Sequence, residues 1–380
     1  MDYKKASLEK HFQTKGKIQI GSKFGKLKTK DDLSIAYTPG VAAVSELLSK
    51  KPKMAYEYSI KANTIAVVSD GSAVLGLGNI GPLGALPVME GKALLFKEFG
   101  NVDAFPIVLA TQDTEEIIDL VKNISPTFGG INLEDISAPR CFEIEERLRH
   151  DLDIPVFHDD QHGTAIVVLA ALINSLKITG KKKKQLEVVI SGAGAAGIAV
   201  AKLLFKFGVG NIVMTDSKGI ISADRRDLNP QKKEMAALGN IHHIKGGISE
   251  ALRGADVFIG VSVAGIISKD MIATMNDKAV VLALANPTPE IMPEEAKAGG
   301  ALIVGTGRSD YPNQINNVLA FPGIFRGALD HRVKQITDEM KLKAARALAS
   351  CVGKKELSPE KIIPSPFDPA VVKKVAVTIK

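Results

Sequence analysis

Residues 186–216 read LEVVISGAGAAGIAVAKLLFKFGVGNIVMTD, and this stretch decides the fold. The apolar run LEVVI predicts a strand, SGAGAAG a turn, the apolar-periodic residues after it a helix, and NIVMT a second strand. Gly192 permits the tight turn, Gly194 lets the backbone approach a pyrophosphate, and Gly197 allows the helix to pack closely on the strand. The stretch therefore predicts a Rossmann-type dinucleotide-binding fold.

The second strand of this unit ends in Asp216, about 20 residues past the last glycine, where a carboxylate can bind ribose hydroxyls. A carboxylate there disfavours a 2′-phosphate, so the sequence favours NAD over NADP, although Lys218 partly offsets the repulsion. The residues expected to contact the dinucleotide are Gly192, Gly194, Ala195, Ala196, Gly197 and Asp216.

Strand and helix patterns alternate on both sides of this unit, which predicts an α/β fold with mainly parallel sheets flanked by helices. A chain of 380 residues is longer than one core usually supports. We expect a substrate and metal domain at 1–162 and the Rossmann-type domain at 163–330, its first strand following the lysines at 181–184. The helical tail at 331–380 is expected to pack back on the first domain.

Two acidic clusters, GGINLED at 129–135 and VFHDDQHGT at 156–164, each follow a short apolar run that predicts a buried strand. Carboxyl ends of parallel strands meet at one edge of a sheet, so four carboxylates would converge there and repel unless a cation or protons neutralised them. Oxygen ligands favour Mg²⁺ or Mn²⁺ over Zn²⁺. The alternative is that Asp135 and Asp160 only cap the following helices. The four carboxylates are Glu134, Asp135, Asp159 and Asp160.

Two further residues are candidates for proton transfer. Lys92 lies in VMEGKALLFK, near the predicted start of a helix, where the helix dipole lowers a lysine pKa and favours a general base. Tyr37 immediately precedes a Pro-Gly turn. A solvated lysine and a half-buried tyrosine anchor are the plain alternatives. The glycines at 76–81 match a loose dinucleotide fingerprint, but Pro82 and Pro87 interrupt the helix it would need, so a pocket wall is favoured.

Composition narrows the function classes. The net charge is +7 and the pI about 9.1, but the lysine runs carry no interleaved aromatic residues, which favours solvated faces over nucleic-acid binding. The two cysteines have no metal-ligand spacing. The charged N-terminus does not match a signal peptide, and the apolar stretch 163–178 predicts a buried connecting helix rather than a membrane span. We expect a cytoplasmic protein without nucleic-acid or membrane partners.

Taken in order, the motifs resemble the malic enzyme family, specifically its short prokaryotic-type branch. The resemblance covers almost the whole chain and is carried by YTPGVA at 37–42, GLGNIGP at 76–82, PVMEGK at 87–92, NLED at 132–135, FHDDQHGTA at 157–165, ANPT at 285–288 and NNVLAFPG at 316–323.

The resemblance implies that Glu134, Asp135 and Asp160 bind Mg²⁺ or Mn²⁺ while Asp159 supports them. It also implies that Lys92 is the general base and Tyr37 the general acid, and that Lys92, Asn286 and Asn317 contact the substrate, with Asn286 also at the nicotinamide. One position departs from the larger malic enzymes, which place an arginine just after the Asp-Gly of the first glycine-rich loop. This chain has Asp70-Gly-Ser-Ala-Val there, so the C1 carboxylate of the substrate needs another partner.

The activity implied is metal-dependent oxidative decarboxylation of (S)-malate to pyruvate and CO₂ with reduction of NAD or NADP. Three alternatives stay open: a malolactic enzyme that releases lactate, an amino-acid dehydrogenase, for which four carboxylates have no use, and a nucleotide-sensing module without catalysis. The resemblance also implies a homodimer or a dimer of dimers. The preferred metal, allosteric effectors and physiological direction are not encoded in any motif.

Overall fold

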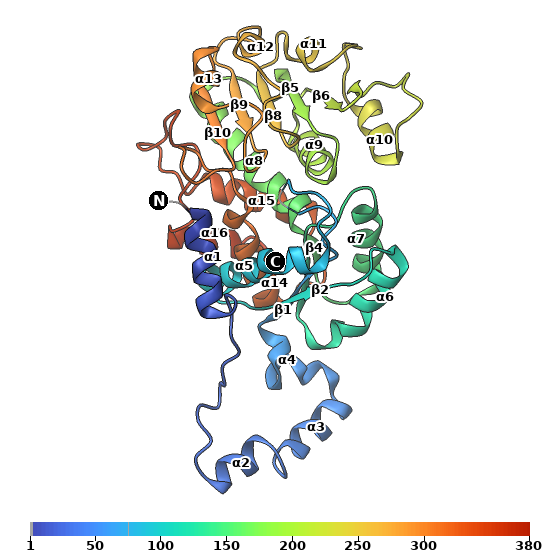
Figure 1. Cartoon of the computed structure of the whole chain (residues 1–380), viewed down its shortest axis with the longest axis vertical. Helices are drawn as coiled ribbons and strands as arrows, with labels where there is room; N and C mark the ends of the chain where they lie inside the picture. The colour runs from blue at the N-terminus through green and yellow to red at the C-terminus, as the bar shows by residue number, and fades with distance from the viewer. Residues whose placement is uncertain (1–2, 75) are drawn as a thin grey trace.

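The computed structural model describes residues 3–74 and 76–380, and two sheets organise them (Figure 1). The first sheet has four parallel strands in the order β2-β1-β3-β4. Its strands are β1 Thr64–Ser69, β2 Asp103–Val108, β3 Gly130–Leu133 and β4 Val156–His158. β1, β3 and β4 are buried along their whole length, as expected for a parallel sheet covered on both faces. Leu133 pairs with Val68 and with His158, so these three strands end at one edge.

Helices cover both faces of this sheet. The helices α5 Gly81–Gly100, α6 Thr114–Ile124 and α7 Arg140–Asp151 connect its strands, and α8 Asp159–Thr179 and α14 Phe321–His331 also pack on it. The expected interruption at Pro82 and Pro87 was wrong, because α5 begins at Gly81 and contains both prolines. Proline is favoured in a first turn, where its missing N–H leaves no bond unmade, and the helix continues through Pro87. Lys92 therefore lies in the middle of α5.

The second sheet has six strands in the order β10-β9-β8-β5-β6-β7, all parallel except for β7, which pairs antiparallel with β6. Its strands are β5 Glu187–Ser191, β6 Asn211–Asp216, β7 Gly219–Ile220, β8 Val257–Gly260, β9 Val280–Ala283 and β10 Ile303–Thr306. Its helices are α9 Ala195–Phe207, α10 Pro230–Leu238, α11 Ile248–Leu252, α12 Lys269–Ile272 and α13 Pro293–Ala298. The α/β fold with two mainly parallel sheets, predicted from the sequence, is confirmed.

The helix α8 joins the two sheets. Its N-terminus follows β4 directly and its C-terminal end precedes β5, with Gly180 as a left-handed C-cap. By length and composition α8 would be able to cross a membrane, and 67% of its most apolar 18-residue window is buried inside the structure. This agrees with the buried connecting helix predicted from its apolar sequence.

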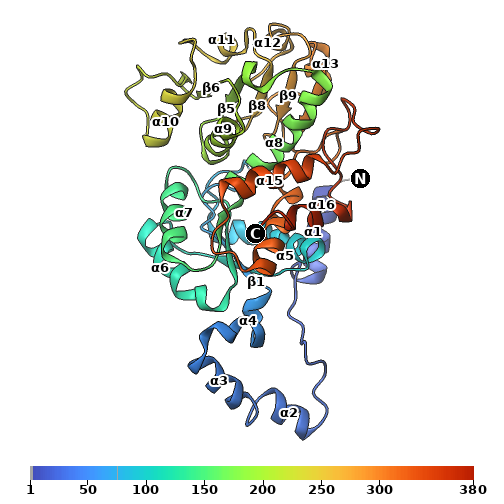
Figure 2. The ribbon, with the colours of Figure 1, turned by 180° about the vertical axis from the view of Figure 1, so that it is seen from behind.

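The C-terminal helices, α15 Asp338–Ala349 and α16 Pro369–Ala376, return to the middle of the molecule. Here α15 packs on α8, and α16 packs on α14 and α5 (Figure 2). One hydrophobic core runs from the first sheet through these helices to the second. The division into 1–162, 163–330 and 331–380 stays a prediction, and its first boundary falls inside α8.

The N-terminal residues form two parts. The helix α1, Tyr3–Thr14, lies beside α16 and α5, whereas residues 18–58, which we call the arm, project from the body beyond the first sheet (Figures 1 and 2). The arm contains the helices α2 Lys30–Ala36, α3 Val41–Lys50 and α4 Ala55–Tyr58, and no residue of these helices is buried. The arm therefore has no core of its own.

Candidate active site

The two acidic clusters meet at the shared edge of the first sheet, as their positions after neighbouring strands predict. Glu134 and Asp135 follow β3, and Asp160 lies in the first turn of α8, directly after β4. One carboxylate oxygen from each of the three lies within 4.8 Å of the others. The backbone N–H of Asp135 donates to Oδ2 of Asp160 at 2.8 Å, and Nδ2 of Asn132 donates to Oε2 of Glu134 at 2.9 Å. The carboxylate cluster therefore combines residues that lie about 25 positions apart in the sequence.

A buried lysine lies against this cluster. Lys92 projects from α5, and its Nζ is 2.9 Å from Oε1 of Glu134 and hydrogen-bonded to the carboxylate of Asp159. The ring of Phe321 lies 4.3 Å from the same nitrogen. Burial lowers the pKa of Lys92, but the carboxylates of Asp159, Glu134 and Asp160 outweigh burial and raise it. The expected lowering by a helix start was wrong, because Lys92 lies in mid-helix and faces carboxylates.

The carboxylates fit a hard divalent cation. Burial raises the pKa of Glu134, and the neighbouring Asp160 and Asp159 raise it further, so the cluster carries repulsion that a cation would remove. Oδ1 of Asp159 is buried and has no hydrogen-bond partner among the described residues. A set of three carboxylates with no sulfur or imidazole donor matches the preference of Mg²⁺ and Mn²⁺. Glu134, Asp135 and Asp160 would hold the ion.

A polar network fixes the first turn of α8. The carboxylate of Glu145, buried on α7, accepts from the backbone N–H of His158 at 3.2 Å, from Gln161 Nε2 at 3.2 Å and from His162 Nε2 at 2.9 Å. Nζ of Lys341, on α15, contacts Nδ1 of His162 at 3.0 Å. Burial raises the pKa of Glu145, but His162, Lys341 and His158 together outweigh burial and lower the pKa to about 2. Sequence analysis missed this network because its members come from three separate helices.

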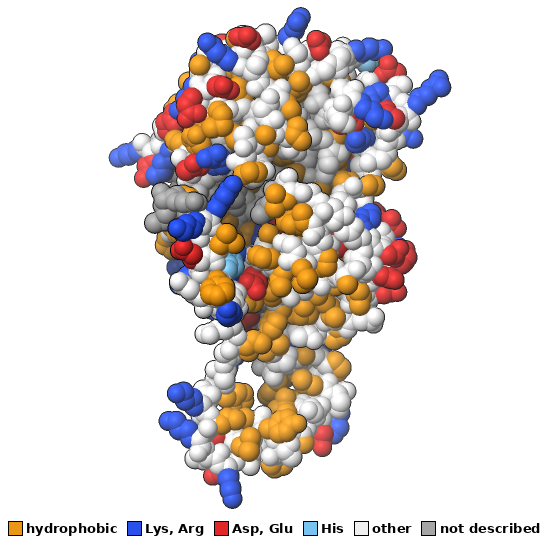
Figure 3. Space-filling model, viewed as in Figure 1, with side chains coloured by type: hydrophobic (Ala, Val, Ile, Leu, Met, Phe, Trp, Pro, Cys, Tyr) orange, Lys and Arg blue, Asp and Glu red, His pale blue; other side chains and the backbone are white. Residues whose placement is uncertain are grey.

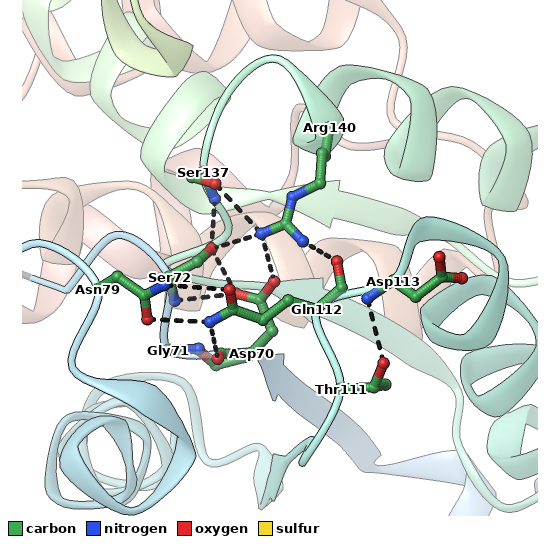
Figure 4. Close-up of polar contacts among 10 residues, drawn as sticks. Asp70, Gly71, Ser72, Asn79, Thr111, Gln112, Asp113, Ser137 and Arg140 are labelled. Carbon is green, nitrogen blue, oxygen red and sulfur yellow. Dashed lines mark hydrogen bonds and ion pairs between the residues drawn. The ribbon is translucent and has the colours of Figure 1, made fainter.

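A second network fixes the turn after β1 (Figure 4). Nη2 of Arg140 donates to the buried carboxylate of Asp70 at 2.8 Å, to Ser72 Oγ at 2.9 Å and to Ser137 Oγ at 3.2 Å, and Nη1 donates to the carbonyl of Gln112. Ser72 Oγ also accepts from the backbone N–H of Ser137 at 2.9 Å. The network ties the turn after β1 to the loop that follows Asp135, and it leaves the guanidinium of Arg140 occupied.

The dinucleotide turn has the geometry its glycines predict. Gly192 has φ 103°, and a Cβ there would lie 2.4 Å from the carbonyl oxygen of Val261. A Cβ on Gly197 would lie 1.8 Å from the carbonyl oxygen of Gly192, so neither position admits a side chain. Gly194 is the N-cap of α9, and a Cβ built on it would have no atom within 4 Å. This open space leaves the helix N-terminus accessible to a ligand.

A cleft of about 970 Å³ between the two sheets brings most of the predicted residues together. Gly76 and Gly78 line it, which confirms the first glycine-rich loop as a pocket wall. The predicted site residues that line the cleft are Lys92, Glu134, Asp135, Asp160, Gly194, Ala195, Ala196, Asn286 and Asn317. The lining does not include Asp159, Gly192, Gly197 or Asp216. Tyr37 is not part of the lining.

Matches to known proteins agree with this arrangement. The family model described as malic enzyme, N-terminal domain, matches residues 17–149, and that described as malic enzyme, NAD binding domain, matches residues 161–379. The chain belongs to the malic enzyme family. It is 59% identical to an NAD-dependent malic enzyme of Geobacillus stearothermophilus, over 95% of this chain and 75% of that one. It is 54% identical to a bifunctional malic/malolactic enzyme of Bacillus subtilis, over 99% and 93%. The crystal structure of an NAD-dependent malic enzyme from Thermotoga maritima matches with a TM-score of 0.95 and 51% identity, over 98% of both chains.

In this malic enzyme family member, two cationic side chains that the sequence did not reveal bind the carboxylate of Asp216. Nη1 and Nη2 of Arg225 lie 2.8 and 3.1 Å from its two carboxylate oxygens, and Nζ of Lys232 lies 2.6 Å from Oδ2. Burial raises the pKa of Asp216, but these hydrogen bonds outweigh burial and lower the pKa to about 2. Lys218, expected to offset the charge of Asp216, pairs with Asp227 instead, at 3.0 Å.

The arm holds Tyr37 away from the cleft of its own chain. Tyr37 is the C-cap of α2 and its side chain is 67% exposed, on the part of the arm that projects beyond the first sheet (Figure 1). In contrast, three residues of the N-terminal segment, Ser7, His11 and Lys17, line the cleft. No local pattern marks these three, since their position depends on how α1 packs.

Proposed function

We propose that this malic enzyme family member oxidises and decarboxylates (S)-malate to pyruvate and CO₂ while reducing NAD, with a divalent cation held by Glu134, Asp135 and Asp160. The observation that carries the proposal is the cleft itself. A buried lysine in contact with a carboxylate cluster opens onto the same space as the N-terminus of a dinucleotide-binding helix at Gly194. Oxidation of a metal-chelated hydroxy acid needs these three parts side by side.

In this mechanism the neutral amine of Lys92 accepts the proton of the C2 hydroxyl. The cation, when bound, would offset the carboxylates that raise the pKa of Lys92 and so favour the neutral amine. Nζ of Lys92 contacts Glu134 and Asp159, so it lies beside the position where the ion would orient that hydroxyl. When bound, the cation would acidify the hydroxyl and stabilise the negative charge that develops as CO₂ leaves, and the nicotinamide would take the hydride. Asp159 holds the ammonium of Lys92 in place from inside the protein, where burial excludes water. Lys92 is therefore both a base and a substrate contact.

Other residues orient the two ligands. Gly192, Gly194 and Gly197 shape the turn for the pyrophosphate, with Ala195 and Ala196 on the first turn of α9. Asn286 and Asn317 line the cleft between the carboxylate cluster and the dinucleotide turn, which supports contacts of Asn286 to the nicotinamide and of both to the substrate. Asp216 would accept from the ribose hydroxyls, which favours NAD over NADP. The cations that neutralise Asp216 would allow some use of NADP.

We further propose a homodimer in which Tyr37 of one copy enters the cleft of the other and protonates C3 of the substrate after CO₂ has left. No tyrosine lines the cleft among the residues that the structure describes. The arm exposes apolar side chains that its own chain does not cover, as Figure 3 shows for the lower part of the molecule. A second copy would cover these side chains and supply the missing acid. The exposed apolar residues of the arm include Ile20, Phe24, Leu33, Ile35 and Tyr37.

A complementation experiment tests this exchange. Tyr37→Phe and Lys92→Ala are expected to be nearly inactive as pure proteins. When the two are unfolded, mixed and refolded, a mixed dimer with exchanged tyrosines contains one site with both native residues, and random pairing restores about a quarter of wild-type activity. A site built within one chain predicts no recovery. Absence of recovery in a mixture shown to contain mixed dimers would refute the exchange.

The activity itself is measured by absorbance at 340 nm with (S)-malate, Mn²⁺ and either NAD or NADP, followed by assays for pyruvate and lactate. Reduced cofactor rising in step with pyruvate supports the proposal, with NAD used better than NADP. The malolactic reaction is the second candidate, because the Bacillus subtilis relative is named a bifunctional malic/malolactic enzyme. Lactate without net reduced cofactor would favour it. If neither product forms while NAD binds, the proposed function is wrong and a nucleotide-sensing role remains.

A further inference from the structure

Two lysines line the cleft, and their surroundings differ. The ammonium of Lys92 pairs with Glu134 and Asp159. Nζ of Lys17 donates to the backbone carbonyl of Pro87 at 2.6 Å, and no carboxylate oxygen of the described residues lies within 4.0 Å of it. A lysine ammonium has three donors, so Lys17 retains capacity for a ligand in the cleft.

The position of Lys17 is fixed by α5 rather than by its flexible side chain alone. Its backbone N–H donates to Oε2 of Glu90 at 3.1 Å, so the chain is anchored to a residue of α5 that lies two positions before Lys92. The ammonium then lies on Pro87 and over Gly91, where a Cβ would come within 3.2 Å of Nζ. Because Gly91 directly precedes Lys92, both lysines belong to the same stretch of the cleft wall.

A further cation in the cleft would suit the charge of the site. The carboxylates of Glu134, Asp135, Asp159 and Asp160 outnumber the single positive charge of Lys92 by three, a divalent ion would offset two of these charges, and a dicarboxylate substrate would add two further negative charges. Ala73, in the turn after β1, lines the cleft without a charge. Arg140, the nearest arginine of that loop network, is occupied by Asp70.

We propose that Lys17 binds the substrate carboxylate that is retained in the product. This inference rests on the proposed function. The retained C1 carboxylate is the suitable partner because the C4 carboxylate must lose its charge as CO₂, and a cation on it would stabilise the substrate more than the transition state. Burial lowers the pKa of Lys17 and Glu90 only partly offsets this, so an anion at Nζ would stabilise the charged form.

The test compares Lys17→Met with wild type. Loss of a charge-assisted hydrogen bond is expected to raise KM for malate about ten- to a hundredfold while kcat changes by less than about threefold. Lys17→Arg should restore most of the affinity. Lys354→Met, which removes an exposed lysine outside both the cleft lining and the arm, is the matched control and should resemble wild type. NAD affinity and the melting temperature should be the same in all four proteins.

Pyruvate separates the two carboxylates, because it keeps only the retained one. Its dissociation constant, titrated by calorimetry into the protein with Mn²⁺ and NADH, should rise in Lys17→Met by about the same factor as KM for malate. Equal pyruvate affinity in Lys17→Met and wild type overturns the proposal, even if KM for malate rises. The titration requires no turnover, so it decides the role of Lys17 also if malate is not oxidised, an outcome that would overturn only the proposed function.

Discussion

Replacing Gly163 by alanine separates helix propensity from packing at the carboxylate cluster. Gly163 is the fifth residue of α8, and alanine in a helix interior is favoured over glycine by about 1 kcal/mol. A Cβ at this position would lie 1.8 Å from Oδ1 of Asp159 and 3.1 Å from Cβ of Asn317. Asp159 is fully buried and its other oxygen bonds Lys92, so its carboxylate cannot turn aside without leaving that partner.

The magnitudes decide the sign. Overpacking a buried site costs about 1–3 kcal/mol, and separating a buried carboxylate from its cation costs about 3–5 kcal/mol. The low end of the second range, less the gain in propensity, leaves a net loss of about 2 kcal/mol. With an unfolding entropy of about 2.1 cal/mol/K per residue, or roughly 0.8 kcal/mol/K for 380 residues, the melting temperature of Gly163→Ala should fall by at least about 2 °C. The value of kcat should fall as well, because Lys92 loses its anchor.

Differential scanning calorimetry and the 340 nm assay measure both effects. The control is Gly353→Ala, where the nearest atom to a new Cβ is Oε2 of Glu356 at 3.8 Å, an ordinary contact. This variant should keep the melting temperature and kcat of wild type. If Gly163→Ala melts at or above the wild-type temperature with unchanged kcat, Asp159 can move aside at no cost. That result would refute the reasoning from packing.

Two further predictions concern the carboxylates. Asp135→Asn removes one of three negative charges around the proposed ion, so the Mn²⁺ concentration for half-maximal binding should rise about tenfold or more. Electron paramagnetic resonance without substrate measures this concentration, and an unchanged value would remove Asp135 from the ligand set. In spite of burial, Arg225 and Lys232 lower the pKa of Asp216 from about 3.8 to about 2. The ionised carboxylate therefore stabilises the folded protein above the unfolded pKa of about 3.8, and this stabilisation is lost as the pH falls toward 2. The stability advantage of wild type over Asp216→Asn, measured by urea midpoints, should therefore be constant from pH 7 to about 5 and shrink below about pH 4, and a pH-independent difference would contradict the assignment.

The sequence alone was sufficient for features that local physics controls. The strand, turn and helix around Gly192 follow from short-range periodicity and from backbone positions that exclude a Cβ, so their prediction needed no tertiary contact. The convergence of Glu134 with Asp160 was also predictable, because alternating strands and helices place carboxyl ends of neighbouring strands at one edge.

Contacts between distant segments were decided only by the tertiary structure. The pKa of Lys92 depends on carboxylates that follow β3 and β4, and the helix dipole argument failed because α5 begins earlier than its prolines indicated. Lys17 faces the cleft because Glu90 and the backbone of α5 hold it there. Tyr37 lies outside the cleft of its own chain because the arm projects from the body. Each of these positions is fixed by residues far away in the chain, whose distances no local pattern encodes.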